Sequence, residues 1–160
     1  MKKFEILASL LLLLGLFLSG CQKEKSVDPT KMHWDRDVCE RCKMAISEKK
    51  FAFQIVNPTT SKVYKFDDIG CGVLWMDEEK IPWKDKAILW VTDAHNGKWI
   101  DARTALYTDD RITPMAYGIA AYTKETLPKG ATVITFEQAR DVIYEIEKLN
   151  VQKLREMRTQ

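Results

Sequence analysis

The stretch Phe51-Ala-Phe-Gln-Ile-Val-Asn-Pro-Thr-Thr-Ser-Lys-Val-Tyr-Lys-Phe-Asp67 contains two short apolar runs separated by a turn sequence. The runs Phe51–Val56 and Lys62–Phe66 have strand length and composition, and Asn57-Pro58 between them marks a turn. This stretch therefore predicts an antiparallel β-hairpin. Asp67, directly after the hairpin, is predicted to cap a helix, because its side chain can accept from free amides of the first turn.

The sequence beyond Asp67 alternates between helix and strand signals. Ile69, Val73 and Met76 form an apolar stripe on the capped helix. Further strands are predicted at Ala87–Val91, Trp99–Ile100, Ile119–Tyr122 and Ala131–Ile134.

A long helix is predicted at the C-terminus. Thr135-Phe-Glu-Gln138 is a capping-box pattern, in which two side chains satisfy backbone amides reciprocally. The packed face that follows is predicted at Ala139, Val142, Ile143, Ile146 and Leu149. Together these patterns predict an α+β fold with antiparallel sheets and a long C-terminal helix.

The order of these signals is repeated along the chain. Met44-Ala45 precedes the first hairpin and helix, and Met115-Ala116 precedes the last two predicted strands and the C-terminal helix. Such a repeat predicts two small related ββα(β)-type halves, placed here at residues 32–100 and 101–160. Chance similarity between two hairpin-and-helix units is the alternative.

The N-terminal segment predicts an extracytoplasmic protein. Residues 1–20 contain two lysines and then an apolar run that is short for a transmembrane helix and typical of a signal peptide. Leu18-Ser-Gly-Cys21 resembles a bacterial lipobox, so we expect cleavage before Cys21 and lipidation of its sulfur. Residues 21–31 would then form a flexible tether to a bacterial membrane. A plain signal peptide or an uncleaved anchor is the alternative.

Composition and missing motifs restrict the function. The net charge is +2, which gives no electrostatic reason to expect a nucleic-acid partner. The sequence contains no nucleophile elbow, phosphate loop or zinc-protease motif. It therefore predicts a binding protein without catalytic residues.

Sulfur-bearing side chains are concentrated in Cys39-Glu-Arg-Cys42-Lys-Met44. Two thiols with this spacing can bind one metal ion within a tight turn, and Met44 adds a thioether. Soft sulfur ligands favour Cu(I). The motif predicts a Cu(I) site made of Cys39, Cys42 and Met44. Met115, which matches Met44 in the repeat, is a further candidate ligand, although either methionine could simply belong to the core.

Other interpretations of the cysteine pair remain open. Cys39 and Cys42 could form a structural disulfide, since an extracytoplasmic compartment is oxidising. They could also act as the redox pair of a thiol–disulfide oxidoreductase.

Three more residues are possible ligands. Cys71 lies off the apolar stripe of the first helix, and it is either a ligand or a small buried thiol. Its neighbours Gly70 and Gly72 indicate close packing against another element. His33 and His95 lie in turn-like contexts, and either could complete a Cys₃His zinc site in a structural adaptor lipoprotein.

The chain resembles the NosL family, accessory lipoproteins of nitrous-oxide reductase maturation. The resemblance rests on Cys39–Met44 against the family pattern CxxCGM, on Tyr64-Lys-Phe-Asp-Asp-Ile69, and on Thr113-Pro-Met115 followed by Ala116–Ala120. It implies two small related domains and a Cu(I)-binding metallochaperone. It also implies delivery of copper to nitrous-oxide reductase alongside an ABC-type transporter.

The resemblance implicates the two CxxCxM cysteines and the methionines Met44 and Met115 as ligands. Two positions depart from the family. Lys43 and Ala116 stand where the family has glycine. A lysine at position 43 could change the turn or place a cation beside a thiolate and lower its pKa.

Overall fold

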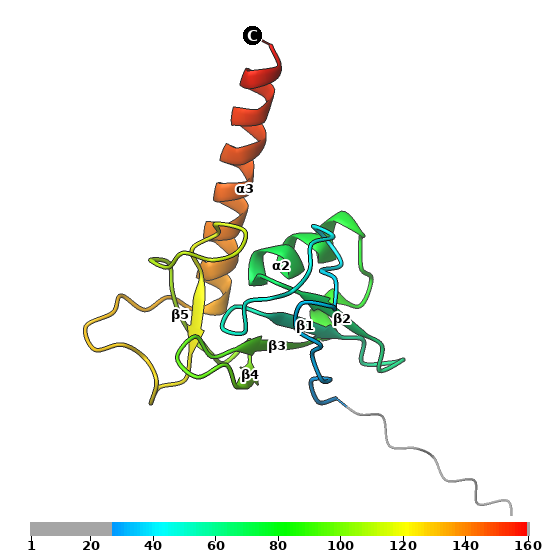
Figure 1. The fold of residues 1–160 in the computed structure, drawn as a ribbon, viewed down its shortest axis with the longest axis vertical. Coiled ribbons are helices and arrows are strands. Elements are labelled where there is room, and N and C mark those ends of the chain that lie inside the picture. The colour runs from blue at the N-terminus through cyan, green and yellow to red at the C-terminus, as the bar shows by residue number, and fades with distance from the viewer. Residues whose placement is uncertain (1–26, 160) are drawn as a thin grey trace, which may run out of the picture.

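In the computed structural model, residues 27–159 are described. The expected signal peptide at residues 1–20, the expected lipidation site Cys21 and residues 22–26 of the expected tether lie outside the described residues. Within them, the α+β class with antiparallel sheets and a long C-terminal helix is confirmed (Figure 1). The division near residue 100 into two related halves stays a prediction.

The predicted hairpin belongs to a four-stranded antiparallel sheet. Strand β1 (Phe53–Val56) pairs with β2 (Val63–Phe66) on one side and with β3 (Ile88–Thr92) on the other. Strand β4 (Trp99–Asp101) pairs with β3, which gives the order β2-β1-β3-β4. A short 3₁₀-helix, η1 (Lys84–Lys86), leads into β3. All four residues of β1 are buried, as expected for a strand covered on both faces.

A second sheet consists of β5 (Leu106–Thr108) and β6 (Ala120–Tyr122). The second hairpin predicted from the sequence is wrong. Ile134 makes an isolated bridge with Tyr107 of β5, and residues 131–134 form no strand of their own. β5 has three residues, too few to give an alternating pattern in the sequence.

Helix α2 (Ile69–Glu78) lies against the first sheet (Figure 1). Its N-cap is Asp68, whose side chain accepts from the Gly70 amide at 2.8 Å, so the predicted cap at Asp67 is wrong by one residue. The predicted stripe is buried, but so is every residue from Ile69 to Met76. A helix that is buried on all sides is apolar on all sides. The apolar periodicity therefore could not show that the second face is also buried.

Two glycines allow the close packing of α2, as the sequence predicted. A Cβ atom at Gly70 would lie 2.2 Å from the ring of Tyr117. A Cβ atom at Gly72 would lie 2.3 Å from the ring of Phe53. The N-terminal turns of α2 are therefore pressed between β1 and the segment that contains Met115 and Tyr117.

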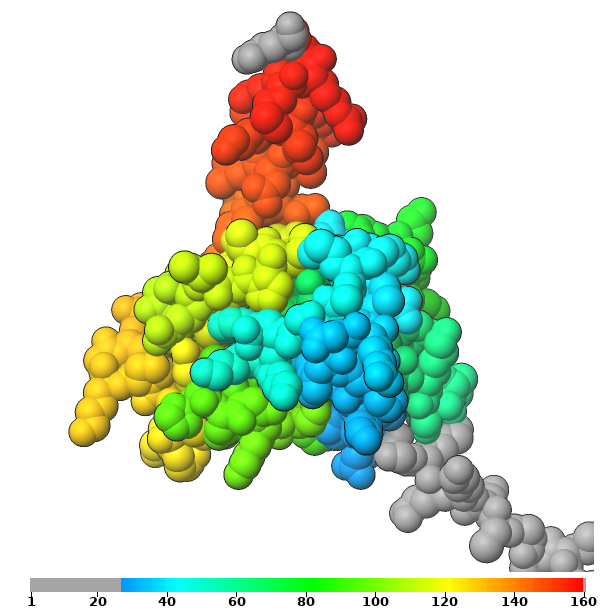
Figure 2. Space-filling view, in the orientation of Figure 1, coloured from blue at the N-terminus to red at the C-terminus, as the bar shows by residue number. Residues whose placement is uncertain are grey.

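Helix α3 (Phe136–Arg158) begins with the predicted capping box between Thr135 and Gln138. Its inner face packs on the core through Ala139 and Ile143. Leu149 was predicted on that face but is 61% exposed, because the helix continues past the body of the protein (Figures 1 and 2). None of the helices within residues 27–159 is both long and apolar enough to span a bilayer.

Candidate metal centre

The sulfur-rich motif folds into a tight turn. The Cys39 amide donates to the Met44 carbonyl at 2.9 Å, and the Lys43 amide donates to the Cys39 carbonyl at 3.1 Å. Lys43 closes the turn with φ of 62°, in the left-handed region that favours glycine. The Glu40 amide donates to the Lys65 carbonyl at 3.0 Å, which fixes the turn to β2.

A second segment brings two further ligand atoms to this turn. Asp67 lies between β2 and α2, and Cys71 lies in the first turn of α2. One possible ligand atom from each of Cys39, Cys42, Asp67 and Cys71 lies within 4.8 Å of the others. We call these four residues the Cys₃Asp cluster. Its members come from two distant parts of the chain, and together they could hold a metal ion.

Burial differs among the three thiols. Cys39 and Cys71 are fully buried, whereas Cys42 is partly exposed. The Cys42 thiol donates to Asp67, with sulfur–oxygen distances of 3.6 Å and 3.8 Å. The three cysteines within residues 27–159 are free thiols, so Cys39 and Cys42 are not joined by a disulfide in this structure. Cys42 is thus the thiol through which an ion could enter or leave.

The three thiols of the cluster also differ in their pKa values. A hydrogen bond from Cys71 is the largest influence on Cys39, and with help from backbone amides it outweighs burial and lowers the pKa of Cys39 to about 7. Burial raises the pKa of Cys42 to about 11. The shared hydrogen bond with Cys39, together with burial, raises the pKa of Cys71. Cys39 is therefore the thiolate that is available near neutral pH, and a thiolate is the form that binds metals.

The cation suggested for position 43 is not the cause of that thiolate. The Lys43 ammonium group is exposed and lies 3.7 Å from the Glu40 carboxylate. The hydrogen bond from Cys71, followed by those from the backbone amides of Asp67, Cys42 and Arg41, lowers the pKa of Cys39 instead. The effect of the lysine is on the backbone of the turn, where it adopts a positive φ.

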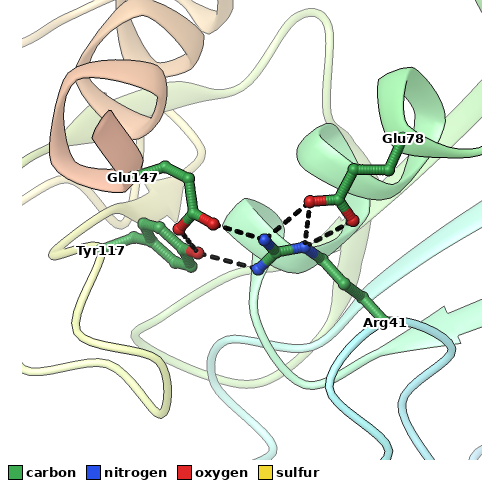
Figure 3. A network of polar contacts seen from close by, with 4 residues as sticks. All are labelled: Arg41, Glu78, Tyr117 and Glu147. Carbon is green, nitrogen blue, oxygen red and sulfur yellow. Dashed lines mark hydrogen bonds and ion pairs between the residues drawn. The ribbon is translucent and has the colours of Figure 1, made fainter. Parts of the chain in front are cut away.

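Arg41, between the two cysteines of the turn, anchors it to both helices (Figure 3). Its guanidinium donates to Glu78 of α2 at 2.8–3.1 Å and to Glu147 of α3 at 2.6 Å. It also donates to the Tyr117 hydroxyl at 3.0 Å, and that hydroxyl donates to Glu147 at 2.7 Å. The side chain of Arg41 is only 16% exposed. This network holds the Cys39–Met44 turn against α2, α3 and the Tyr117 segment.

The two candidate methionines lie in different surroundings. Met44 is 46% exposed on the outside of the turn. Met115 is partly buried, and its amide donates to Asp68, the neighbour of Asp67, at 3.3 Å. Ala116, after Met115, has φ of 59°, again a value in the left-handed region that favours glycine. The assignment of either thioether as a ligand stays a prediction.

The two histidines lie on the surface, outside the Cys₃Asp cluster. His33 is exposed, and its Nδ1 atom is 3.6 Å from the Asp37 carboxylate. His95 is exposed in a turn, where its amide donates to Asp93. The residue that the structure places beside the three thiols is therefore Asp67 rather than a histidine. Asp67 was interpreted as a helix cap, and only its position beside Cys71 could have suggested a ligand.

Comparison with known proteins supports the fold. The sequence matches no protein-family model and no curated protein. Among solved structures, the chain is similar to the crystal structure of the copper chaperone NosL from Shewanella denitrificans, with a TM-score of 0.54. The chain has a NosL-like fold. The alignment covers 69% of this chain and 96% of that NosL at 16% identity, so the likeness concerns the fold.

Proposed function

We propose that this protein is an extracytoplasmic, lipid-anchored chaperone that binds Cu(I) and supplies copper for nitrous-oxide reductase maturation. The observation that carries the proposal is the convergence of Cys39, Cys42 and Cys71 within a NosL-like fold. Three thiols at one point provide the soft ligand set that selects Cu(I). Copper is the cargo of such a protein, which needs no catalytic residue.

The burial of the thiols suits transfer of the ion. Cys39 supplies a buried thiolate near neutral pH, and Cys42 is partly exposed. An incoming sulfur ligand from a partner can reach the ion on the Cys42 side before the buried sulfurs release it. Exposed Met44 on the same turn offers a neutral thioether during this exchange. Copper binding should release protons from Cys42 and Cys71, whose pKa values are raised.

The chaperone proposal is tested by titrating Cu(I) into the reduced full-length protein without oxygen, against a competing chelator. We expect one equivalent to bind, with a thiolate-to-copper absorption band. Cys39→Ala should abolish tight binding. Met115→Ala should weaken it if this thioether is a ligand, whereas Ile112→Ala, at a side chain that is 95% exposed, serves as the control. Absence of the band, together with metal-free turnover of a dithiol substrate, would favour the oxidoreductase alternative.

Asp67 favours a second candidate metal ion, Zn(II). Three thiolates and one carboxylate oxygen form a tetrahedral set that Zn(II) accepts, and such a site would serve a structural role. The two metals are distinguished by Asp67→Asn. This variant should weaken Zn(II) binding and leave Cu(I) affinity unchanged if copper uses sulfur alone.

The cellular setting belongs to the same proposal. Lipidation of Cys21 would hold the protein on a bacterial membrane outside the cytoplasm, together with an ABC-type transporter and nitrous-oxide reductase. Cys21→Ser should release the protein from the membrane fraction. If the protein stays in that fraction without lipid on residue 21, the anchor is of another kind.

A further inference from the structure

The first described residues, 27–32, lie across one face of the four-stranded sheet, and we call them the strap. Gln54 of β1, which is fully buried, holds Thr30 by two hydrogen bonds. Its side chain accepts from the Thr30 amide at 2.8 Å and donates to the Thr30 carbonyl at 2.9 Å. Trp90 of β3 donates to the Val27 carbonyl at 2.8 Å. The chain is therefore attached to the sheet from its first described residue onward.

The strap and helix α2 lie on opposite faces of this sheet. Successive residues of a strand point to opposite faces. Gln54 points to the strap, and its neighbour Phe53 packs against Gly72 of α2. Figure 1 shows the same arrangement, with α2 above the sheet and the blue strap beginning below it. Because α2 contributes Cys71, the Cys₃Asp cluster lies on the side of the sheet away from the strap.

The chain between the expected lipid and the strap is short. Cys21 lies six residues before Val27. An extended chain spans at most about 3.6 Å per residue, so the anchored sulfur stays within about 22 Å of the strap. Helix α3, with 23 residues, is about 34 Å long, and the strap lies beyond its inner end (Figure 1). The anchored protein therefore cannot stand with the outer end of α3 towards the membrane.

Two tryptophans share the face of the sheet that the strap crosses. Trp90 pairs directly with Gln54, so both side chains point to the strap side. Trp99 of β4 pairs with Thr92, two residues beyond Trp90, and therefore points to the same side. Both tryptophans are partly exposed, and Val27 is 49% exposed. Tryptophan is enriched where proteins meet the headgroup region of a bilayer, so this face has the chemistry of a membrane contact.

We propose that the strap side of the sheet lies on the bilayer and that the Cys₃Asp cluster faces the aqueous side. This inference rests on the lipid anchor of the proposed function. The anchor keeps the strap side close to the headgroups, so a weak contact is formed at high effective concentration. A partner that exchanges copper then reaches Cys42 from the water, without lifting the protein from the membrane.

The orientation is tested by quenching of tryptophan fluorescence with brominated lipid. The full-length lipidated protein is placed in vesicles of phosphatidylglycerol and brominated phosphatidylcholine, in which only tryptophans near the bilayer are quenched. Trp99→Phe should lower the quenched fraction of the emission, because it removes a quenched tryptophan. Trp83→Phe is the matched control. Trp83 stacks on Tyr64, which contacts Trp75 of α2, so its loss should raise the quenched fraction.

Circular dichroism establishes that both phenylalanine variants are folded. A protein that carries lipid on Cys21 and floats with the vesicles, but shows no quenching, would overturn the proposal and leave the anchor intact. So would a quenched fraction that falls with Trp83→Phe and not with Trp99→Phe. If mass spectrometry finds no lipid on Cys21, the anchor fails and the orientation fails with it. Copper binding is measured separately, and none of these outcomes depends on it.

Discussion

At the scale of single residues, two of the five non-glycine residues with positive φ within residues 27–159 stand next to the candidate methionines. Lys43 and Ala116 have φ of 62° and 59°, and each is adjacent to one of the candidate methionines. A residue with a Cβ atom in this region costs about 1 kcal/mol or more. The backbone of both segments is therefore held in place by its surroundings rather than by its own preference.

Lys43→Gly and Ala116→Gly should each raise the free energy of unfolding by about 0.5 kcal/mol, because relief of strain slightly exceeds the entropic cost of glycine. Urea denaturation measures the change. Lys124→Gly, at an exposed turn residue without positive φ, is the control and should lower stability. If Lys43→Gly is as destabilising as Lys124→Gly, the turn is not strained.

A second prediction concerns the hydrogen bond from Cys71 to Cys39, which is the main cause of the lowered Cys39 pKa. Cys71→Ala removes the donor, so the pKa of Cys39 should rise above about 7 toward its ordinary value near 9. Cys71→Ser keeps a donor and should shift it less. Thiolate absorbance measured against pH, without oxygen or metal, gives the midpoint. An unchanged midpoint in the alanine variant would contradict the assigned cause.

A spacing of two residues restricts Cys39 and Cys42 to one turn, so the sequence could predict that these two thiols lie together. It could not predict which other side chains join them. Cys71 was placed among the possible ligands, and Asp67 among the helix caps. Which side chains meet across the chain depends on how α2 docks onto the turn, and no local pattern contains that information.

At the scale of elements, the capping box of α3 could be predicted because its physical cause is local. The glycines of α2 indicated close packing, but not that the rings packed against them are those of Tyr117 and Phe53. Strand β5 could not be predicted, because its three residues gain their conformation from pairing with β6 and Ile134. The sequence also did not show where the packed face of α3 ends. Apolar periodicity continues through Leu154 and Met157, although the body of the protein ends earlier.

Arg41 joins three elements, and a third prediction follows from its network. Arg41→Ala leaves Glu147 and Tyr117 without their cation, so the free energy of unfolding should fall by about 2 kcal/mol. Arg41→Lys should recover only part of this, because an ammonium group cannot reproduce the forked contacts. Arg36→Ala, at an exposed arginine in the same region, is the control and should change stability by less than about 0.5 kcal/mol. If the two alanine variants lower the free energy of unfolding equally, the Arg41 network does not stabilise the fold.

At the scale of the whole molecule, Asp93 joins the two sheets. It is fully buried at the end of β3, where residue 93 bridges Ala121 of β6. Its carboxylate accepts from the amides of His95 and Thr123 and from the Thr126 hydroxyl. Burial acts to raise the pKa of Asp93, but these hydrogen bonds outweigh it, and the pKa is lowered.

A fourth prediction is a pH dependence of stability that comes from Asp93. Because its pKa is lower in the folded protein, its stabilisation is present above about pH 4 and is lost as pH falls through the folded value. Asp93→Asn removes an acceptor for Thr123 and should cost about 1–3 kcal/mol at neutral pH. The difference from the wild type should shrink in acid. Urea denaturation at several pH values checks this, and a pH-independent difference would contradict it.

The central claim is that sulfur atoms from the cysteine turn and from α2 bind one Cu(I) ion together. X-ray absorption at the copper edge of the anaerobically loaded full-length protein tests it directly. We predict a first shell composed only of sulfur, from which Cys71→Ala removes one scatterer without displacing the copper. A shell of oxygen or nitrogen, or one that Cys71→Ala leaves unchanged, would contradict the claim.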